Sequence, residues 1–253
     1  MPSLLWIGVG SAPGVTTAVA SVAATWPDDA RRTILVEADA SGGDLASRGG
    51  LPLAPGLVEL AADARRANAI QHTGLLHQHA QPAMLAGRQV EVVVAPPGPA
   101  QARVALPALI RSGVLAGDAD TVVHVDAGRV GPHDPAWQLL ASADVVVAVV
   151  RSRADALAHL DALVPDLRRA VGERLVVLLS QDDRYPPGEV SNTVDVPVLP
   201  VGLPTDPGAA GVLTGTLRAG RRWRRLPLFA AAATVADVLC KRLESTSAMA
   251  AVG

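Results

Sequence analysis

Residues 4–25 read LLWIGVGSAPGVTTAVASVAAT, and this stretch decides the fold. An apolar run at 4–9 leads into a turn that contains Gly10 and Gly14, and residues 15–25 follow with helical spacing. Strand, glycine-containing turn and helix in this order begin a βα unit. The first turn of such a helix offers unpaired backbone N–H groups and the positive end of the helix dipole. We therefore expect residues 14–17 to hold an anion, most simply a phosphate chain.

The same alternation of apolar runs and helical stretches continues along the chain. Buried parallel strands read as continuous apolar runs. The expected strands are 4–9, 33–37, 90–95, 121–125, 145–150, 175–179 and 197–201. The expected helices are 15–25, 58–66, 100–112, 135–141, 153–171, 207–214 and 228–244, with an inserted helix and loop at 68–88. The pattern predicts an α/β fold: a three-layer α/β/α sandwich with a mostly parallel, doubly wound sheet of about seven strands.

Composition narrows the class of protein. A chain of 253 residues with 49% hydrophobic residues can bury one substantial core. The formal net charge of -2 excludes a global attraction to nucleic acid or anionic membrane, so such binding needs a local patch. The single cysteine, Cys240, cannot form an internal disulfide, which favours a cytoplasmic location. Neither a signal peptide nor a transmembrane helix is expected.

Three further segments carry acidic or turn residues at the ends of expected strands. Residues 34–46 read ILVEADASGGDLA, residues 121–131 read TVVHVDAGRVG, and residues 196–215 read VPVLPVGLPTDPGAAGVLTG. The carboxyl ends of parallel strands share one edge of the sheet, where ligands bind in open α/β folds. Asp126 is therefore a candidate magnesium ligand, because Mg²⁺ prefers carboxylate oxygens and water.

Together with GSAPGVTT at 10–17, these segments resemble the ParA/MinD-type family of P-loop ATPases (SIMIBI class), in the family's order, over most of residues 1–216. The loop aligns without gaps to the family's KGGVGKTT. The resemblance implies a P-loop NTPase fold that binds ATP or ADP with Mg²⁺ through the loop residues Gly10, Ser11, Ala12, Pro13, Gly14, Val15, Thr16 and Thr17.

Other roles follow from the same resemblance. Thr16, Asp39 and Asp126 are the implied metal site, and Asp39 also falls on the aspartate that positions the attacking water. Pro204 and Asp206 fall in a turn that lies beside the base, and Ser180 or Gln181 stands where relatives carry a base-contacting Asn. Residues 1–227 would form the ATPase-like domain, and residues 228–253 a C-terminal helix packed on it with a flexible tail from Ser245.

Both lysines of the family loop are absent. Gly10 replaces the lysine that reaches a partner's nucleotide, and Val15 replaces the lysine that contacts the β and γ phosphates. Cationic groups that offset the negative charge on the transferring phosphoryl group usually dominate such catalysis, so without these lysines hydrolysis should be weak or absent. The expected function is a dimerising localisation or assembly factor, either chromosome-partitioning-like or, like the TadZ/CpaE type with their eroded loops, positioning a Tad pilus or secretion system. The Ala-, Arg- and Pro-rich composition suggests an actinobacterial source.

Two alternatives stay open. An active ATPase could use a relocated cation, with Arg129, Arg151 and Arg153 as candidates. A dinucleotide-binding protein could use GVGSAPG at 8–14 as its fingerprint and Glu37 as the ribose-binding acid, although Pro13 stands where the third glycine belongs.

Two clusters outside these motifs are ambiguous. His72, His77 and His79 have a spacing that does not place all three on one helix face, which argues against a metal site. Five arginines surround Trp223 in RAGRRWRR at 218–225. These arginines, Arg218, Arg221, Arg222, Arg224 and Arg225, form either a solvated linker or a contact for DNA, anionic membrane or an acidic partner, and the protein would then reside at the nucleoid or the inner face of the membrane.

Overall fold

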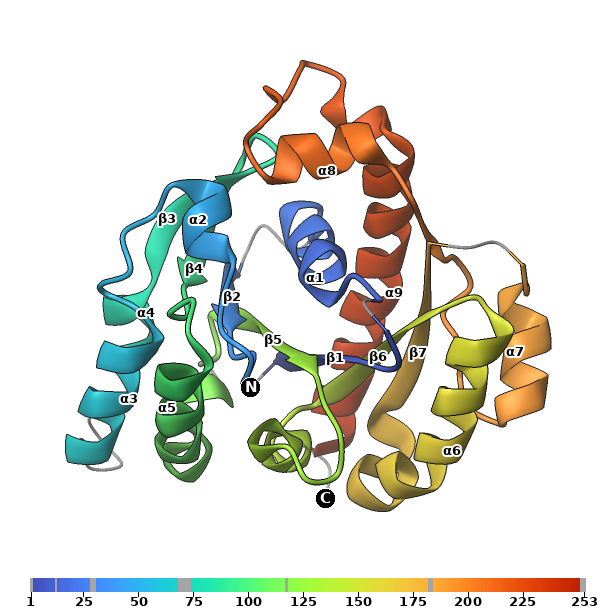
Figure 1. Ribbon diagram of the computed structural model, residues 1–253, viewed down its shortest axis with the longest axis horizontal. Helices are drawn as coiled ribbons and strands as arrows, with labels where there is room; N and C mark the ends of the chain where they lie inside the picture. The colour runs from blue at the N-terminus through green and yellow to red at the C-terminus, as the bar shows by residue number, and fades with distance from the viewer. Residues whose placement is uncertain are drawn as a thin grey trace.

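The computed structural model describes residues 2–11, 13–27, 31–67, 74–116, 118–181 and 184–250. Within them, eight strands form one sheet in the order β3-β4-β2-β5-β1-β6-β7-β8 (Figure 1). The strands are β1 Ser3–Gly8, β2 Arg32–Glu37, β3 Gln81–Leu85, β4 Arg88–Val93, β5 Thr121–Arg129, β6 Val145–Arg151, β7 Leu175–Gln181 and β8 Leu203–Pro204. All neighbours pair in parallel except β3 and β4. The predicted mostly parallel, doubly wound sheet is confirmed.

Helices cover both faces of the sheet (Figure 1). The α-helices are α1 Val15–Ala24, α2 Leu45–Gly49, α3 Leu57–Arg66, α4 Leu75–His79, α5 Pro99–Ser112, α6 Ala154–Val171, α7 Pro187–Val194, α8 Pro207–Leu213 and α9 Pro227–Ala250. Four short 3-10 helices are η1 Val114–Ala116, η2 Pro135–Ala141, η3 Gly172–Arg174 and η4 Trp223–Arg225. The residues expected as a helix at 135–141 therefore form a 3-10 helix.

The two faces have separate apolar cores. Helices α1, α8 and α9 pack on one face, and α3, α5, α6 and α7 pack on the other. The central strands are apolar on both sides because both sides are covered; β6, for example, is buried from Val145 through Val150. The predicted three-layer sandwich is therefore confirmed, and α1 and α9 pack against each other on the same face of the sheet.

The expectation of a helix and loop at 68–88 is wrong in its second half. Residues 68–73 lie outside the described part of the chain, α4 follows, and residues 81–88 then enter an antiparallel hairpin between β3 and β4. Exposure alternates along β3, where Pro82 and Met84 are exposed, as expected for an edge strand. Ala86 and Gly87 both have positive φ, which suits a tight two-residue hairpin turn.

The expected strand at 197–201 is also corrected. Only Val198 forms a bridge there, with Val177 of β7, and the regular pairing resumes at β8. Pro197 and Pro200 lack the N–H groups that a ladder needs, so this stretch cannot pair regularly. At the other end of the chain, α9 continues through Ser245 to Ala250.

Candidate functional site

The loop between β1 and α1 has the backbone geometry of a phosphate cradle. Gly10 and Gly14 both have positive φ, at 77° and 80°, which glycine adopts without strain. Gly14 is the N-cap of α1 and makes no side-chain cap, so the N–H groups of the first helical turn are left for another partner. Ala12, one of the predicted loop residues, lies outside the described residues.

Val15 belongs to the core. It is 6% exposed, and a Cβ on Gly8 would lie 2.8 Å from its Cγ2 atom, so the valine packs directly on the end of β1. Val15 stands where the family that the sequence resembles has its phosphate-contacting lysine. This position is thus filled by a buried apolar side chain. Lys241 is the sole lysine of the sequence, and it lies 13 residues along α9 from Leu228, about 20 Å at the α-helical rise.

Asp126 lies at the carboxyl end of β5 beneath the first turn of α1. Its Oδ1 atom accepts a hydrogen bond from the Gly128 N–H at 2.9 Å, and the nearby Thr16 side chain lowers the pKa of the carboxyl group. Its Oδ2 atom is buried and has no partner among the described residues. Burial, together with the negative charges of Glu37 and Asp39, raises the pKa of Asp126 to about 7.

Asp39 is the second predicted metal ligand, and it lies against the same turn. A Cβ on Gly128 would come within 1.9 Å of the Asp39 Oδ2 atom, so only glycine fits there. The Oδ1 atom accepts a hydrogen bond from the Ser41 N–H at 2.7 Å. Burial raises the pKa of Asp39, and the charges of Asp134 and Asp44 add to this. The fold thus brings Thr16, Asp39 and Asp126 together at the N-terminus of α1.

Glu37 has a role that the sequence did not indicate. Its Oε1 atom accepts hydrogen bonds from the N–H groups of Asp44 and Leu45, at 2.6 and 3.0 Å, and its Oε2 atom accepts one from Ala95 at 3.0 Å. The side chain therefore ties the loop after β2 to the end of β4. Burial raises the pKa of Glu37. With both oxygens engaged in the interior, Glu37 is unsuited to bind a ribose, which argues against the dinucleotide alternative.

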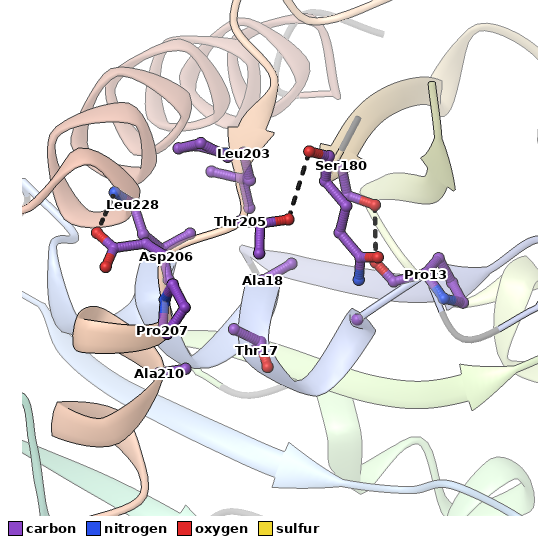
Figure 2. Close-up of a pocket in the computed structure, with 13 residues that line it drawn as sticks. Pro13, Thr17, Ala18, Ser180, Leu203, Thr205, Asp206, Pro207, Ala210 and Leu228 are labelled. Atoms are coloured by element: carbon purple, nitrogen blue, oxygen red, sulfur yellow. Dashed lines mark hydrogen bonds between the residues drawn. The ribbon is translucent and has the colours of Figure 1, made fainter. Parts of the chain in front are cut away.

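A pocket of about 260 Å³ opens on one side of the loop (Figure 2). Pro13, Gly14, Thr17, Pro204 and Asp206 are among the residues that line it. The predicted base-side turn is therefore next to the loop. Figure 2 shows that much of the lining is apolar, and that Leu228 of α9 closes one wall.

The polar side chains around this pocket are bonded within the protein. Ser180 donates to the Pro13 carbonyl at 2.7 Å, so it fixes the loop. Asp206 caps α8 by accepting from the Ala209 N–H at 2.9 Å, and it also accepts from the Leu228 N–H at 3.3 Å. Thr205 donates to the Gln181 carbonyl at 3.4 Å. Two of the predicted base-side residues, Ser180 and Asp206, thus also shape the pocket.

A larger cleft, of about 690 Å³, opens on the other side of the loop. Gly10 and Ser11 line it, as do Arg103 of α5 and Arg129 at the end of β5. Arg129 was a candidate for a relocated cation, whereas Arg103 was missed, because a single arginine on an exposed helix face carries no signal in the sequence. Neither Arg151 nor Arg153 lines this cleft or the pocket; Arg153 pairs with Asp155 at 3.1 Å.

The two ambiguous clusters are separate from this site. His77 contacts Asp118 at 3.0 Å and His79 contacts Asp63 at 2.9 Å, while His72 lies outside the described residues. No metal-binding group of three His, Cys, Asp or Glu residues occurs in the part of the chain that the structure describes. Trp223 packs edge to face on Phe229, with ring centroids 4.8 Å apart, and the five surrounding arginines are exposed.

Comparison with solved structures identifies the fold. A ParA family ATPase from Chlorobium tepidum TLS superposes with a TM-score of 0.72 at 15% identity, covering 93% of this chain and 98% of that one. MinD complexed with Mg-ADP from Pyrococcus horikoshii OT3 gives 0.69 at 16% identity, covering 94% and 95%. The MinC:MinD complex of Aquifex aeolicus gives 0.68 at 10% identity, covering 95% and 96%.

No protein-family model matches the chain, and no curated protein matches it by sequence. At these identities the likeness establishes the fold, which is that of the ParA and MinD ATPases, as predicted. Among the described residues, no helix combines the length and the apolar character needed to cross a membrane.

Proposed function

We propose that this chain is a ParA/MinD-like protein that binds ATP or ADP with Mg²⁺, hydrolyses ATP weakly or not at all, and acts as a localisation or assembly factor. The observation that carries the proposal is the contrast around the first turn of α1. Asp126 keeps a buried oxygen that has no partner among the described residues, and it lies beside Thr16, whereas Val15 is part of the core.

The residues present suit a magnesium ion. Mg²⁺ is held by a few oxygen ligands and water, and Thr16, Asp39 and Asp126 supply a hydroxyl and two carboxylates next to the phosphate cradle. Bound there, the ion would neutralise phosphate charge and relieve the repulsion among the buried carboxylates. Backbone N–H groups of residues 10–17 would hold the phosphates, and the pocket beside Pro204 and Asp206 would take the base.

The test is calorimetric titration with MgATP, with ATP in EDTA and with MgADP, combined with a phosphate-release assay. We expect measurable, Mg²⁺-dependent binding and very slow turnover. Val15→Lys should raise the affinity for ATP about tenfold by adding a charged donor. Val58→Lys, at an exposed position on α3, is the matched control for the added lysine. Brisk turnover by the wild-type protein would overturn the proposal.

One observation favours a second candidate, an active ATPase with a relocated cation. Arg129 is exposed, lines the cleft beside Gly10 and makes no ion pair with the described residues. This candidate predicts that Asp39→Ala and Arg129→Ala each abolish turnover. Turnover that survives both substitutions would exclude it.

We further propose a homodimer that recruits a protein partner, such as a partition component or a pilus or secretion component, in the cytoplasm. A MinD neighbour forms a complex with MinC, so a protein with this fold can assemble with another protein. Light scattering with and without MgATP tests the dimer: a mass that stays monomeric in both conditions would contradict it.

The arginine cluster at 218–225 is a candidate contact for DNA or an anionic membrane. No acidic residue occurs between Pro207 and Ala236, and none of the five arginines forms an ion pair with a described residue. They also precede the N-terminus of α9, where the helix dipole is positive, so an anionic partner would offset the repulsion. Replacing Arg221 and Arg222 by Gln should weaken binding to duplex DNA or to anionic vesicles.

A further inference from the structure

Two arginines lie on the side of the phosphate loop that faces away from the base pocket. Arg103, on the first half of α5, and Arg129, the last residue of β5, both line the cleft of about 690 Å³. Gly10 and Ser11 of the loop line the same cleft, and Gly14 and Thr17 line the base pocket. The loop therefore runs between the two cavities, so a nucleotide whose base fills the pocket would extend its last phosphate toward the cleft.

The charge balance of the cleft favours an anion. Arg103 and Arg129 are exposed, and neither forms an ion pair with a residue in the described part of the chain. The one acidic residue in the lining is Asp134, whose Oδ1 atom accepts a hydrogen bond from the Ala136 N–H at 2.8 Å. Guanidinium groups suit phosphate because their planar donors can form paired hydrogen bonds with its oxygens.

Arg103 also contacts the segment that follows Asp39. Its Nε atom donates to the Ala40 carbonyl at 3.2 Å, which leaves the two terminal nitrogens for another acceptor. Ser41, next in the chain, lines the cleft and donates its N–H to Asp39. An anion bound by Arg103 would thus be linked through one side chain to the loop that carries Asp39.

We propose that Arg103 and Arg129 bind the terminal phosphate of a triphosphate from within the same chain, and that Arg103 transmits its presence to residues 39–43. The inference rests on the proposed nucleotide site and deepens it. The chain then distinguishes a triphosphate from a diphosphate by binding alone, without lysine in the loop and without hydrolysis. The ligand class is a linear triphosphate, either as part of a nucleotide or as the free inorganic anion.

The experiment compares MgATP, MgADP and inorganic tripolyphosphate by calorimetry on the full chain. Arg103→Gln and Arg129→Gln should each lower the affinity for MgATP about tenfold, the size expected for one charge-assisted contact, and leave MgADP within about twofold. Arg111→Gln, on the last turn of the same helix, is the matched control and should change neither. Equal losses for MgATP and MgADP, or no loss for either, would overturn the proposal.

Hydrogen exchange supplies a second measurement. MgATP should slow exchange of the Ser41, Gly42 and Gly43 amides more than MgADP does in the wild-type protein, and this difference should vanish in Arg103→Gln. Tripolyphosphate separates the two proposals: if it binds in an Arg103-dependent manner while nucleotides do not bind, the proposed nucleotide function fails and the arginine site stands. If tripolyphosphate and nucleotides both fail to bind, both proposals fail.

Discussion

His124 and Asp126 are two residues apart on β5, and both are buried, yet their surroundings differ. Asp126 lies at the carboxyl end of the strand with Thr16, Asp39 and the first turn of α1 around it. His124 lies deeper, stacked on Trp6 with ring centroids 6.1 Å apart and edge to face with Trp26 at 4.7 Å. Each has ring or carboxyl atoms without a partner among the described residues.

The difference teaches how to interpret an unsatisfied buried polar atom. The Asp126 Oδ2 atom belongs to a group of oxygens that suits a cation, next to a cradle that suits an anion. The His124 ring packs between Trp6 and Trp26 within reach of the Arg88 charge. In the described part of the chain, neither its two nitrogens nor the Nε1 atoms of these tryptophans have a hydrogen-bond partner. At Asp126 we interpret the missing partner as the place of the proposed ligand, whereas at His124 it is a cost to stability.

The substitution with the largest expected effect is Asp126→Asn. The pKa of Asp126 is about 7 in the folded chain against an ordinary value of 3.8, so the folded state retains a proton that the unfolded state releases as the pH rises from 4 to 7. Wild-type stability therefore falls over that window, and the variant should be more stable at pH 8 by about 2–4 kcal/mol. Its Mg²⁺-dependent affinity for nucleotide should drop about 100-fold.

Denaturant unfolding at pH 5 and pH 8, with calorimetry for affinity, measures both effects. Asp120→Asn, at an exposed position just before β5, is the control. The variant could instead be less stable than wild type at pH 8 and bind nucleotide normally. Asp126 would then stabilise the core and would have no part in ligand binding.

Glu37→Gln tests a third buried polar group, which is fully partnered. The Glu37 carboxylate accepts hydrogen bonds from three backbone N–H groups. Gln keeps one acceptor oxygen, but its NH₂ group would face an N–H donor. We expect a loss of about 2–3 kcal/mol in the free energy of unfolding. Urea unfolding measures it, with Glu173→Gln at an exposed position as control. A variant with wild-type stability would mean that these three hydrogen bonds contribute nothing net.

His124→Leu should have a smaller effect at neutral pH and none on the ligand site. Removing a ring with two unpartnered nitrogens should raise stability by about 1 kcal/mol at pH 7. Burial lowers the pKa of His124 to about 3, so as the pH falls below 6.5 the unfolded state takes up a proton that the folded state refuses. Wild-type stability should therefore drop by about 2 kcal/mol between pH 6.5 and pH 5 through this residue.

Thermal or denaturant unfolding between pH 7 and pH 5 measures this effect: the stability of His124→Leu should fall less than that of the wild-type protein as the pH is lowered. Nucleotide affinity should stay within about twofold of wild type, since the His124 ring packs against Trp6 and Trp26 and lines neither the pocket nor the cleft. A large loss of affinity would show that His124 and Asp126 are not independent of each other and would break the comparison.

Ser180→Ala has the smallest expected effect. The hydroxyl group donates to the Pro13 carbonyl and is buried, so its loss should cost about 1 kcal/mol in stability. Because the hydroxyl group fixes the loop rather than a ligand, the affinity for nucleotide should fall by about twofold or less. Affinity that falls tenfold with unchanged stability would instead assign Ser180 to the base, the role that the family resemblance implied.

The strands of the sheet could be predicted because each buried parallel strand is an apolar run, as in β1 and β6. β3 was missed because it alternates in exposure and contains Pro82, and 197–201 was overpredicted because apolar character does not reveal two missing N–H donors. At the candidate site, the positions of the phosphate loop and of the carboxylates could be predicted, because they follow predicted strands in the order that the family shows. The partners of Glu37 and the placement of Arg103 depend on segments 58 and 63 residues away, which no local pattern encodes.

The packing of α9 on α1 has a consequence for how the protein is made. The phosphate cradle precedes α9 by about 200 residues, but the helix that carries it packs against α9, and Leu228 of α9 lines the base pocket. During synthesis the N-terminal segments emerge first. A nascent chain in which α9 has not yet emerged would therefore leave α1 uncovered on one side, and competence to capture nucleotide would arrive only once α9 has packed against α1.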